Sequence, residues 1–195
     1  MKIIHHRRNT IEQLRATPPE YGVEIDIRSR GTDLILNHDP FAPGERLDDW
    51  LVEFHHGTLI LNVKEEGLEQ ACLERMRRFG IEDFFFLDQS FPFLVKTALT
   101  GEKRCAVRVS EFESIDTAMA LQGMVRWVWV DCFKKFPLSR QQADRLRQAG
   151  FTFCLVSPEL QGRTEPAHIA AMRQLLDGLR IPAEAVCTKT PELWR

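Results

Sequence analysis

Two acidic residues lie at alternate positions in a segment that otherwise has the pattern of a buried strand. Val23, Ile25 and Ile27 form an apolar stripe with a period of two, and Glu24 and Asp26 lie on the opposite stripe. Side chains two apart on one strand face are about 6–7 Å from each other, so two carboxylates can hold one cation between them. An unpaired charge in a core costs several kcal/mol. We therefore predict that this acidic pair binds a cationic partner.

The strands expected to follow in the sequence also end in polar residues. The alternation that places Glu24 and Asp26 inside a sheet places Asn62 and Lys64 on the interior stripe of the strand at 58–64, and Arg108 on that of the strand at 105–110. The other residues predicted to face the interior are Ile60, Phe84, Phe86, Asp88, Ala106, Ser110, Trp127, Trp129, Asp131, Phe153, Leu155 and Ser157. Each stripe begins apolar or small and becomes polar toward its C-terminal end, which is the end at which barrel enzymes place their active sites.

Purely structural roles are open for several of these polar residues. Charges at strand ends are commonly solvated, and this is the simple interpretation of Asp88 and Asp131. Asp39 precedes a proline and is interpreted as a turn residue. The acidic pair could form ion pairs that tie strands together, although buried ion pairs seldom add stability. The basic residues available for such pairs are Arg28, Lys64 and Arg108.

The chemistry requires elements that bring these strand ends together, and the sequence alternates strands with helices. The predicted strands are 2–5, 22–28, 33–37, 58–64, 83–88, 105–110, 126–131, 151–157 and 184–188. The predicted helices are 45–54, 65–80, 91–100, 111–122, 138–150 and 166–180. Eight strand–helix units favour an α/β fold, a compact (β/α)8 TIM barrel in which residues 1–195 form a single domain. An open doubly wound sheet is the alternative, but no glycine-rich phosphate loop follows any strand.

Composition excludes several classes of function. The 195-residue chain carries a net charge of −2, which gives no reason to expect a nucleic-acid partner. No apolar run is long enough to span a bilayer, and the N-terminal residues do not have the pattern of a signal peptide, so no integral membrane segment is expected. The five cysteines are far apart in the sequence, which is typical of reduced thiols in a cytoplasmic protein. The oligomeric state is not determined by these features.

Four motifs in order resemble a known family. They are HHRRNT at 5–10, VEIDIR at 23–28, LILNHDP at 34–40 and LNVK at 61–64. Together they are similar to the signature of the glycerophosphodiester phosphodiesterases, which belong to the phospholipase C-like phosphodiesterase superfamily and have (β/α)8 barrels. The resemblance is strong over residues 3–64 and weaker beyond, where DQSFP at 88–92 and VCTKTP at 186–191 match family segments.

The resemblance implies roles for individual residues. His6 and His38 match the catalytic histidines and Arg7 the neighbouring arginine, while Glu24 and Asp26 match ligands of a divalent cation. The third ligand position falls on Asn62, where the family has glutamate; its carbonyl oxygen suits Ca²⁺ or Mg²⁺ but removes one negative charge, so weaker metal binding is expected. Lys64 matches the family lysine. The residues expected to bind the substrate phosphate are Arg7, Lys64 and Arg108.

The expected activity is metal-assisted hydrolysis of a small phosphodiester with acid/base catalysis by the two histidines. The resemblance implies attack by a neighbouring substrate hydroxyl through a cyclic phosphate. The principal alternative is a non-catalytic or weakly catalytic barrel that binds a phosphorylated sugar or lipid head group, which Arg8 and Asn62 favour because both depart from the family pattern. An isomerase or epimerase is a third hypothesis, to which no motif points. A phosphodiesterase acting at membranes is a fourth, for which Phe41 and Phe91 would supply an apolar rim.

Overall fold

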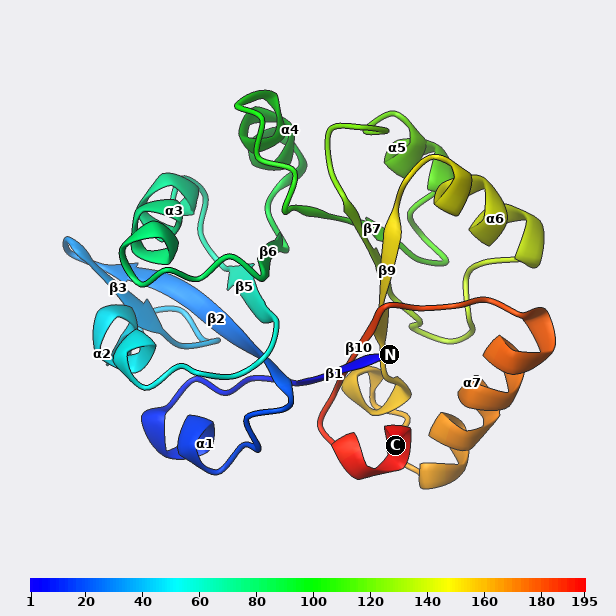
Figure 1. The fold of residues 1–195 in the computed structure, drawn as a ribbon, viewed down its shortest axis with the longest axis horizontal. Coiled ribbons are helices and arrows are strands. Elements are labelled where there is room, and N and C mark those ends of the chain that lie inside the picture. Colours follow the sequence, from blue (N-terminus) through cyan, green and yellow to red (C-terminus); the bar gives the residue numbers. More distant parts are fainter.

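The computed structural model describes residues 1–195 and contains a curled sheet with helices on its outer side (Figure 1). Eight parallel strands run in the pairing order β6-β5-β2-β1-β10-β9-β8-β7. Their bounds are β1 Lys2–His5, β2 Gly22–Arg30, β5 Leu59–Val63, β6 Phe84–Leu87, β7 Ala106–Val109, β8 Trp127–Val130, β9 Thr152–Val156 and β10 Ala185–Thr188. The predicted α/β fold with alternating parallel strands and helices is confirmed.

Two short antiparallel strands extend the sheet beside β2. β3 (Asp33–Leu36) turns back along the C-terminal half of β2, and β4 (Glu45–Arg46) pairs with β3. The strand expected at 33–37 is therefore present, whereas residues 45 and 46 belong to a strand and not to the helix expected there. Because β3 is antiparallel to β2, its C-terminal end lies beside Asp26, and the amide N–H of Asn37 donates to the Asp26 carbonyl oxygen at 3.1 Å. His38 is the next residue and therefore also lies near Asp26.

Helices cover the outer side of the sheet, and most begin close to their predicted positions. Their bounds are α1 Ile11–Arg15, α2 Leu47–Val52, α3 Glu69–Arg78, α4 Phe91–Leu99, α5 Ile115–Met119, α6 Arg140–Gln148 and α7 Pro166–Leu179, with 3₁₀ turns η1 Pro158–Gln161 and η2 Pro191–Trp194. Ser139 caps α6, and its hydroxyl accepts a hydrogen bond from the backbone N–H of Gln142. The short helix α1 was not predicted from the sequence; its five residues follow a capping box formed by Thr10 and Gln13. No helix is long and apolar enough to cross a membrane.

Apolar residues pack in two separate layers on the two sides of the sheet. The outer layer, between strands and helices, contains 40 buried residues, and the interior layer contains 11 strand residues, so most of the apolar burial lies against the helices. Val23, Ile25 and Ile27 belong to the outer layer, as their period-two pattern predicts. Their neighbours Glu24 and Asp26 therefore point inward, as expected.

The interior phase predicted for β6 and β9 is wrong. Phe85 and Leu87 face inward on β6, whereas Phe84 and Phe86 pack against the helices. The prediction had placed Asp88 on an interior stripe, but Asp88 has a φ of 58°, and this left-handed backbone ends the strand alternation. Without Asp88 as a guide, the run of three phenylalanines contains no polar residue that shows which face of β6 points inward.

On β9 a polar strand end again gave a misleading indication of the interior. Cys154 and Val156 face inward, whereas Phe153 and Leu155 belong to the outer layer. Ser157 is fully buried, and its hydroxyl accepts a hydrogen bond of 2.8 Å from Trp194 Nε1 near the C-terminus. The hydroxyl is therefore satisfied by the C-terminal 3₁₀ turn, which the strand pattern does not predict.

The sheet is not a closed barrel, which corrects one part of the predicted fold. β6 and β7 share no ladder; a single bridge joins Phe86 to Cys105, and the Phe86 N–H donates to the carbonyl oxygen of Arg104 at 2.8 Å. We call this incompletely paired junction the seam. Across it, the rings of Phe85 and Trp127 stack with centroids 4.5 Å apart. Side-chain packing thus adds to the few main-chain contacts across the seam.

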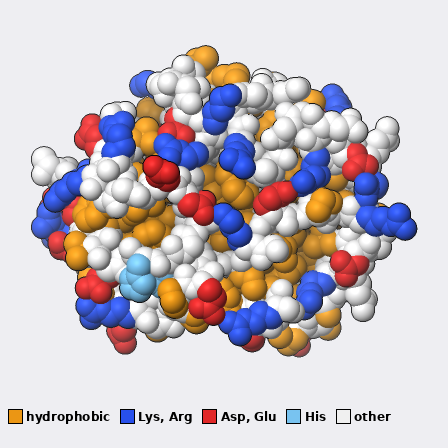
Figure 2. Space-filling view, in the orientation of Figure 1, with side chains coloured by type: hydrophobic (Ala, Val, Ile, Leu, Met, Phe, Trp, Pro, Cys, Tyr) orange, Lys and Arg blue, Asp and Glu red, His pale blue; other side chains and the backbone are white.

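The two chain ends approach each other at the opposite side of the sheet. β1 pairs in parallel with both β2 and β10, so it joins the group of strands that precedes the seam to the group that follows it (Figure 1). On the face shown in Figure 2, Lys and Arg side chains are interspersed with Asp and Glu, and no large area carries one sign of charge. That distribution accords with the small net charge.

Candidate active site at the C-terminal ends of the strands

Glu24 occupies the centre of the candidate site and is fully buried. Its carboxylate accepts hydrogen bonds from the backbone N–H of Arg7 at 2.7 Å and from Asn62 Nδ2 at 2.8 Å. The Nε2 atom of His6 lies 3.7 Å from Glu24 Oε2. Burial, with Asp26 alongside, raises the pKa of Glu24. The site therefore contains a carboxyl group whose negative charge is disfavoured until a further positive group approaches.

Asp26 is equally buried and is surrounded by donors. Its carboxylate accepts a hydrogen bond of 2.8 Å from Asn9 Nδ2, and Asn9 Oδ1 accepts one of 2.8 Å from the Asp26 backbone N–H. Arg7 Nε and Lys64 Nζ each lie 3.2 Å from a carboxylate oxygen of Asp26. The structural interpretation considered for the acidic pair is thus correct for Lys64, which does form an ion pair with Asp26.

Arg7 contacts both acids because its backbone is unusual. Its φ of 55° lies in the left-handed region, which is uncommon for a residue with a side chain. In this conformation its N–H points to Glu24 while its guanidinium lies beside Asp26. The Arg7 side chain is nevertheless 41% exposed, so part of the guanidinium remains accessible to a ligand.

The two candidate histidines differ in environment. The imidazole of His6 is mostly buried, and burial, followed by the nearby Arg7 charge, lowers the pKa of His6 to about 3. Its Nδ1 atom is buried without a hydrogen-bond partner. The imidazole of His38 is 44% exposed, and its Nδ1 lies 2.8 Å from Asp39 Oδ1. One imidazole is therefore neutral and enclosed, and the other is accessible and oriented by a carboxylate.

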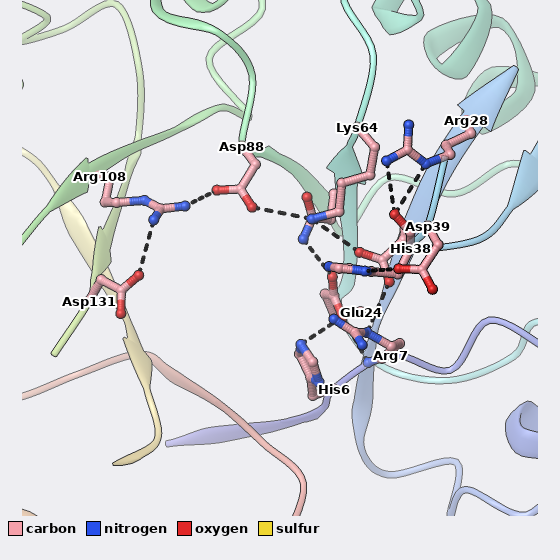
Figure 3. A network of polar contacts seen from close by, with 12 residues as sticks. His6, Arg7, Glu24, Arg28, His38, Asp39, Lys64, Asp88, Arg108 and Asp131 are labelled. Atoms are coloured by element: carbon pink, nitrogen blue, oxygen red, sulfur yellow. Dashed lines mark hydrogen bonds and ion pairs between the residues drawn. The ribbon is translucent and has the colours of Figure 1, made fainter. Parts of the chain in front are cut away.

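Arg7 connects the environments of the two histidines. It is the chain neighbour of His6, and it lines a polar cavity of about 550 Å³ together with His38 and Asp39. Arg28 donates to the backbone carbonyl of His38 at 2.9 and 3.1 Å, which holds this segment against β2. Both histidines therefore lie at the same edge of the sheet, as their predicted roles require (Figure 3).

A row of alternating charges extends from this site across the seam (Figure 3). Lys64 Nζ lies 3.2 Å from Asp26 and 3.5 Å from Asp88, and Asp88 forms an ion pair with Arg108. Arg108 also lies 3.2 Å from Asp131. Arg108 thus reaches the acidic pair only through Asp88 and Lys64. Its expected phosphate contact stays a prediction, because two carboxylates already occupy its guanidinium.

The oxygen atoms around the acidic pair are partly suited to binding a hard cation. Asp26 Oδ1 and Asn62 Oδ1 are buried without hydrogen-bond partners, and the two residues are register partners on β2 and β5. Carboxylate and amide oxygens are the ligands that Ca²⁺ and Mg²⁺ prefer. Lys64 lies 3.2 Å from that same Asp26 oxygen, and no group of three acidic, histidine or cysteine residues has the arrangement of a metal site. A cation would therefore share the site with Lys64.

Three acidic residues here have larger roles than their sequence positions indicate. The following proline predicts a turn role for Asp39, but its carboxylate also contacts Nδ1 of the His38 ring. The strand-end pattern predicts solvated carboxylates at Asp88 and Asp131, yet both contact Arg108, and Asp131 is 2% exposed. For Asp39 the adjacent histidine is a usable signal. For the other two, each follows a buried strand directly, but only the folded chain shows which cation they meet.

Comparison with known proteins supports the fold. No family model matches the sequence, and no curated protein matches it. Among solved structures, a glycerophosphodiester phosphodiesterase from Agrobacterium tumefaciens str. C58 is similar with a TM-score of 0.65 and 15% identity, covering 100% of this chain and 98% of that one. A glycerophosphoryl diester phosphodiesterase from Parabacteroides distasonis ATCC 8503 gives 0.66 and 15%, covering 98% and 84%.

The fold is also shared with an enzyme of another class. A mutant tryptophan synthase α-subunit from the hyperthermophile Pyrococcus furiosus has a TM-score of 0.58 and 13% identity, covering 98% of this chain and 88% of that one. The resemblance inferred from the four motifs is therefore confirmed at the level of the fold, since two of the similar structures are glycerophosphodiester phosphodiesterases. Fold similarity alone does not assign an activity, which depends on the site.

Proposed function

We propose that this protein is a phosphodiester hydrolase that cleaves a small diester in the manner of glycerophosphodiester phosphodiesterases. The observation that carries the proposal is the single cluster formed by His6, Arg7, Glu24 and Asp26 at the C-terminal ends of β1 and β2. Barrel enzymes place their active sites at this edge of the sheet. The similarity of fold to two such phosphodiesterases supports the assignment.

Arg7 and Lys64 are the groups proposed to bind the phosphate. A phosphodiester carries one negative charge, and the transition state places more on its non-bridging oxygens. The partly exposed Arg7 guanidinium can present two N–H donors to those oxygens. Lys64 adds a positive charge beside Asp26, and Arg108 would join only after release from Asp88. The carboxylates that now hold these side chains keep them oriented before substrate binds.

The two histidines are proposed to transfer the protons. His6, whose neutral imidazole has its Nε2 atom 3.7 Å from Glu24 Oε2, is proposed to accept the proton of the attacking substrate hydroxyl. That oxygen forms a bond to phosphorus as the bond to the leaving alcohol breaks. His38, held at Nδ1 by Asp39, suits donation of a proton to the departing alkoxide. Water then opens the cyclic phosphate with the roles of the histidines reversed.

A divalent cation is part of the proposal. Glu24, Asp26 and Asn62 are the residues that would hold it. A bound Ca²⁺ or Mg²⁺ supplies charge that polarises a phosphoryl oxygen. Because Asn62 stands where the related family has a glutamate, the residues here offer two carboxylates and not three. We therefore expect weak binding, with half-saturation in the millimolar range on the order of that of low-charge calcium sites.

The test is hydrolysis of a panel of phosphodiesters by the wild type, His6→Ala and His38→Ala, each with EDTA, Ca²⁺ or Mg²⁺. The proposal expects hydrolysis by the wild type, stimulation by a cation and a loss of about 10²-fold or more in each variant. Arg15→Ala is a suitable control, because this exposed residue pairs with Glu53 away from the site. Activity that survives both histidine substitutions would exclude the proton-transfer roles.

A second function, binding without turnover, is favoured by one observation. The acidic pair is already compensated by donors of the chain itself, namely Asn9, Asn62, Arg7 and Lys64. Such a site can bind a phosphorylated sugar or lipid head group without a metal. Calorimetric titration with glycerol 3-phosphate distinguishes the two functions: tight binding together with no product from any diester under any cation supports the binding module.

A further inference from the structure

A large cavity lies in the seam between β6 and β7. Beyond the bridge of Phe86 to Cys105 the two strands share no ladder, and the space between them, together with the starts of α4 and α5, forms a cavity of about 680 Å³. This volume is in the range of small-molecule sites. Half of the residues that line it are apolar, and those that matter below are Asp88, Phe91, Arg108, Phe112, Glu113 and Thr117.

The apolar wall of this cavity includes two exposed aromatic side chains. Both residues line the cavity, and their side chains are exposed to solvent: Phe91 is 50% exposed and Phe112 is 75% exposed. Phe112 lies against Phe133 with ring centroids 5.7 Å apart. Each exposed ring costs free energy in water that a bound hydrocarbon would recover. The wall therefore has the character of an apolar ligand site.

The polar part of the cavity is connected to the candidate active site. Asp88 and Arg108 line it, and Lys64 bridges Asp88 to Asp26. Within the cavity Arg108 is balanced by Asp88 and by Glu113, which lies 4.0 Å away. The cavity thus has no excess positive charge for a second phosphate. A group that extends from a phosphate bound at Arg7 and Lys64 into this space meets neutralised charges first and apolar side chains next.

We propose that the seam cavity binds the hydrocarbon part of one alcohol of the phosphodiester, so that the preferred substrates are diesters with an alkyl-bearing alcohol. This inference rests on the proposed function and specifies its substrate class. The hydrocarbon would enter between β6 and β7, where the ladder that would close a barrel is absent.

The first test measures binding without catalysis. Methyl, butyl and octyl methylphosphonate are singly charged diester analogues that resist hydrolysis, and calorimetric titration below their aggregation concentrations gives their affinities. Burial of each methylene increases affinity by at most about fourfold. We expect octyl methylphosphonate to bind at least about 30-fold more tightly than the methyl compound. Equal affinities for the three compounds, or no binding by any, overturn the inference.

Two variants locate the hydrocarbon. Thr117→Trp fills the cavity from an exposed position of α5, and Phe112→Asn removes part of its wall; each is expected to reduce the affinity for the octyl compound at least tenfold and to leave that for the methyl compound unchanged. Phe41→Asn is the matched control, since Phe41 is fully exposed but does not line the cavity. A preference for the octyl compound that both cavity variants retain also overturns the inference.

Hydrolysis of 2-hydroxypropyl p-nitrophenyl phosphate, a small diester with the neighbouring hydroxyl that the proposed mechanism uses, separates this inference from the proposed function. If the wild type cleaves that small diester and shows no preference for longer alkyl groups, the proposed activity stands and the cavity assignment is wrong. If octyl binding depends on Phe112 and no diester is cleaved, the cavity assignment stands and the site is a binding module. Circular dichroism of each variant confirms that the fold is retained.

Discussion

His38 depends on its sequence neighbour for orientation. The carboxylate of Asp39 lies 2.8 Å from His38 Nδ1, and the hydrogen bond lowers the pKa of Asp39. A carboxylate at Nδ1 selects one tautomer of the ring, and in the proposed reaction Nε2 is the nitrogen that exchanges the proton. This arrangement makes Asp39 a positioning residue in the proposed reaction.

Asp39→Asn is expected to lower kcat at least tenfold while leaving KM within about twofold, because the amide still fills the position but no longer stabilises a protonated ring. Steady-state kinetics over a range of pH measures this, and the pH profile of the variant should differ from that of the wild type. Asp33→Asn is the control, since Asp33 lies in the same hairpin and pairs with Arg46. Unchanged kinetics in the Asp39 variant would exclude the role.

Asn62 determines the charge of the proposed cation site. It donates to Glu24, and its own oxygen is buried without a partner. Asn62→Glu places a third carboxylate beside two buried ones, so in EDTA we expect the free energy of unfolding to fall by about 3 kcal/mol. Saturation with Ca²⁺ should restore about 2.7 kcal/mol at a concentration of 100 Kd.

Urea unfolding with and without Ca²⁺ measures both effects for Asn62→Glu. The Asn62→Gln variant retains an amide and serves as control, and its response to Ca²⁺ should be as small as that of the wild type. A glutamate variant that is as stable as the wild type in EDTA would contradict the assigned environment of Asn62.

At the scale of elements, the seam is held by side chains. The stacked rings of Phe85 and Trp127 connect β6 to β8 across β7, where the small side chain of Ala106 lies on the same interior layer. Toward the C-terminal ends of the strands the ion pair of Asp88 and Arg108 spans the same seam. These contacts replace the missing ladder between β6 and β7.

Trp127→Ala is expected to lower the free energy of unfolding by about 3–5 kcal/mol, because it removes a large buried ring and its stacking partner cannot fill the space. Chemical denaturation monitored by circular dichroism measures the change. Trp129→Ala provides the comparison and should cost less, since Trp129 lies on the same face of β8 but outside the stack of Phe85 and Trp127. Equal losses would mean that the stack adds nothing at the seam.

For the whole molecule, β1 joins the strands on both sides of the seam. It pairs with β2 over two residues and with β10 over four, so the groups of strands in Figure 1 share one continuous sheet. If residues 1–195 form a single domain, the two groups of strands should unfold together. Loss of either group leaves β1 with an unpaired edge, and this couples the two groups.

We expect one cooperative unfolding transition. Trp50→Phe leaves tryptophans only at positions 127, 129 and 194, all after the seam in the sequence. Urea unfolding of this variant followed by tryptophan fluorescence should have the same midpoint as unfolding followed by far-ultraviolet circular dichroism, which reports all helices. Midpoints that differ by more than the experimental error would indicate two separately unfolding units.

Sequence pattern alone is sufficient to predict the alternation of elements and the location of the acidic pair. Period-two stripes on 22–28 and 58–64 contain unambiguous apolar faces, so their polar residues could be placed inside without coordinates. The ordered motifs predicted which side chains meet at the first strands, and Glu24, Asp26, Asn62 and Lys64 do lie together. The local pattern is sufficient to assign the inward and outward faces of these strands, because neighbouring apolar and polar residues distinguish the two faces.

The interior phase of β6, the ion pairs of Arg108 and the open seam follow from the folded chain and not from any local pattern. A run of phenylalanines has no polar face to read, and the left-handed backbone of Asp88 turns its side chain toward Lys64 and Arg108 against the alternation. Whether β6 and β7 pair depends on how all the other strands curl, and this is a property of the whole sheet. Contacts between residues distant in sequence are fixed by packing geometry, and no local period encodes them.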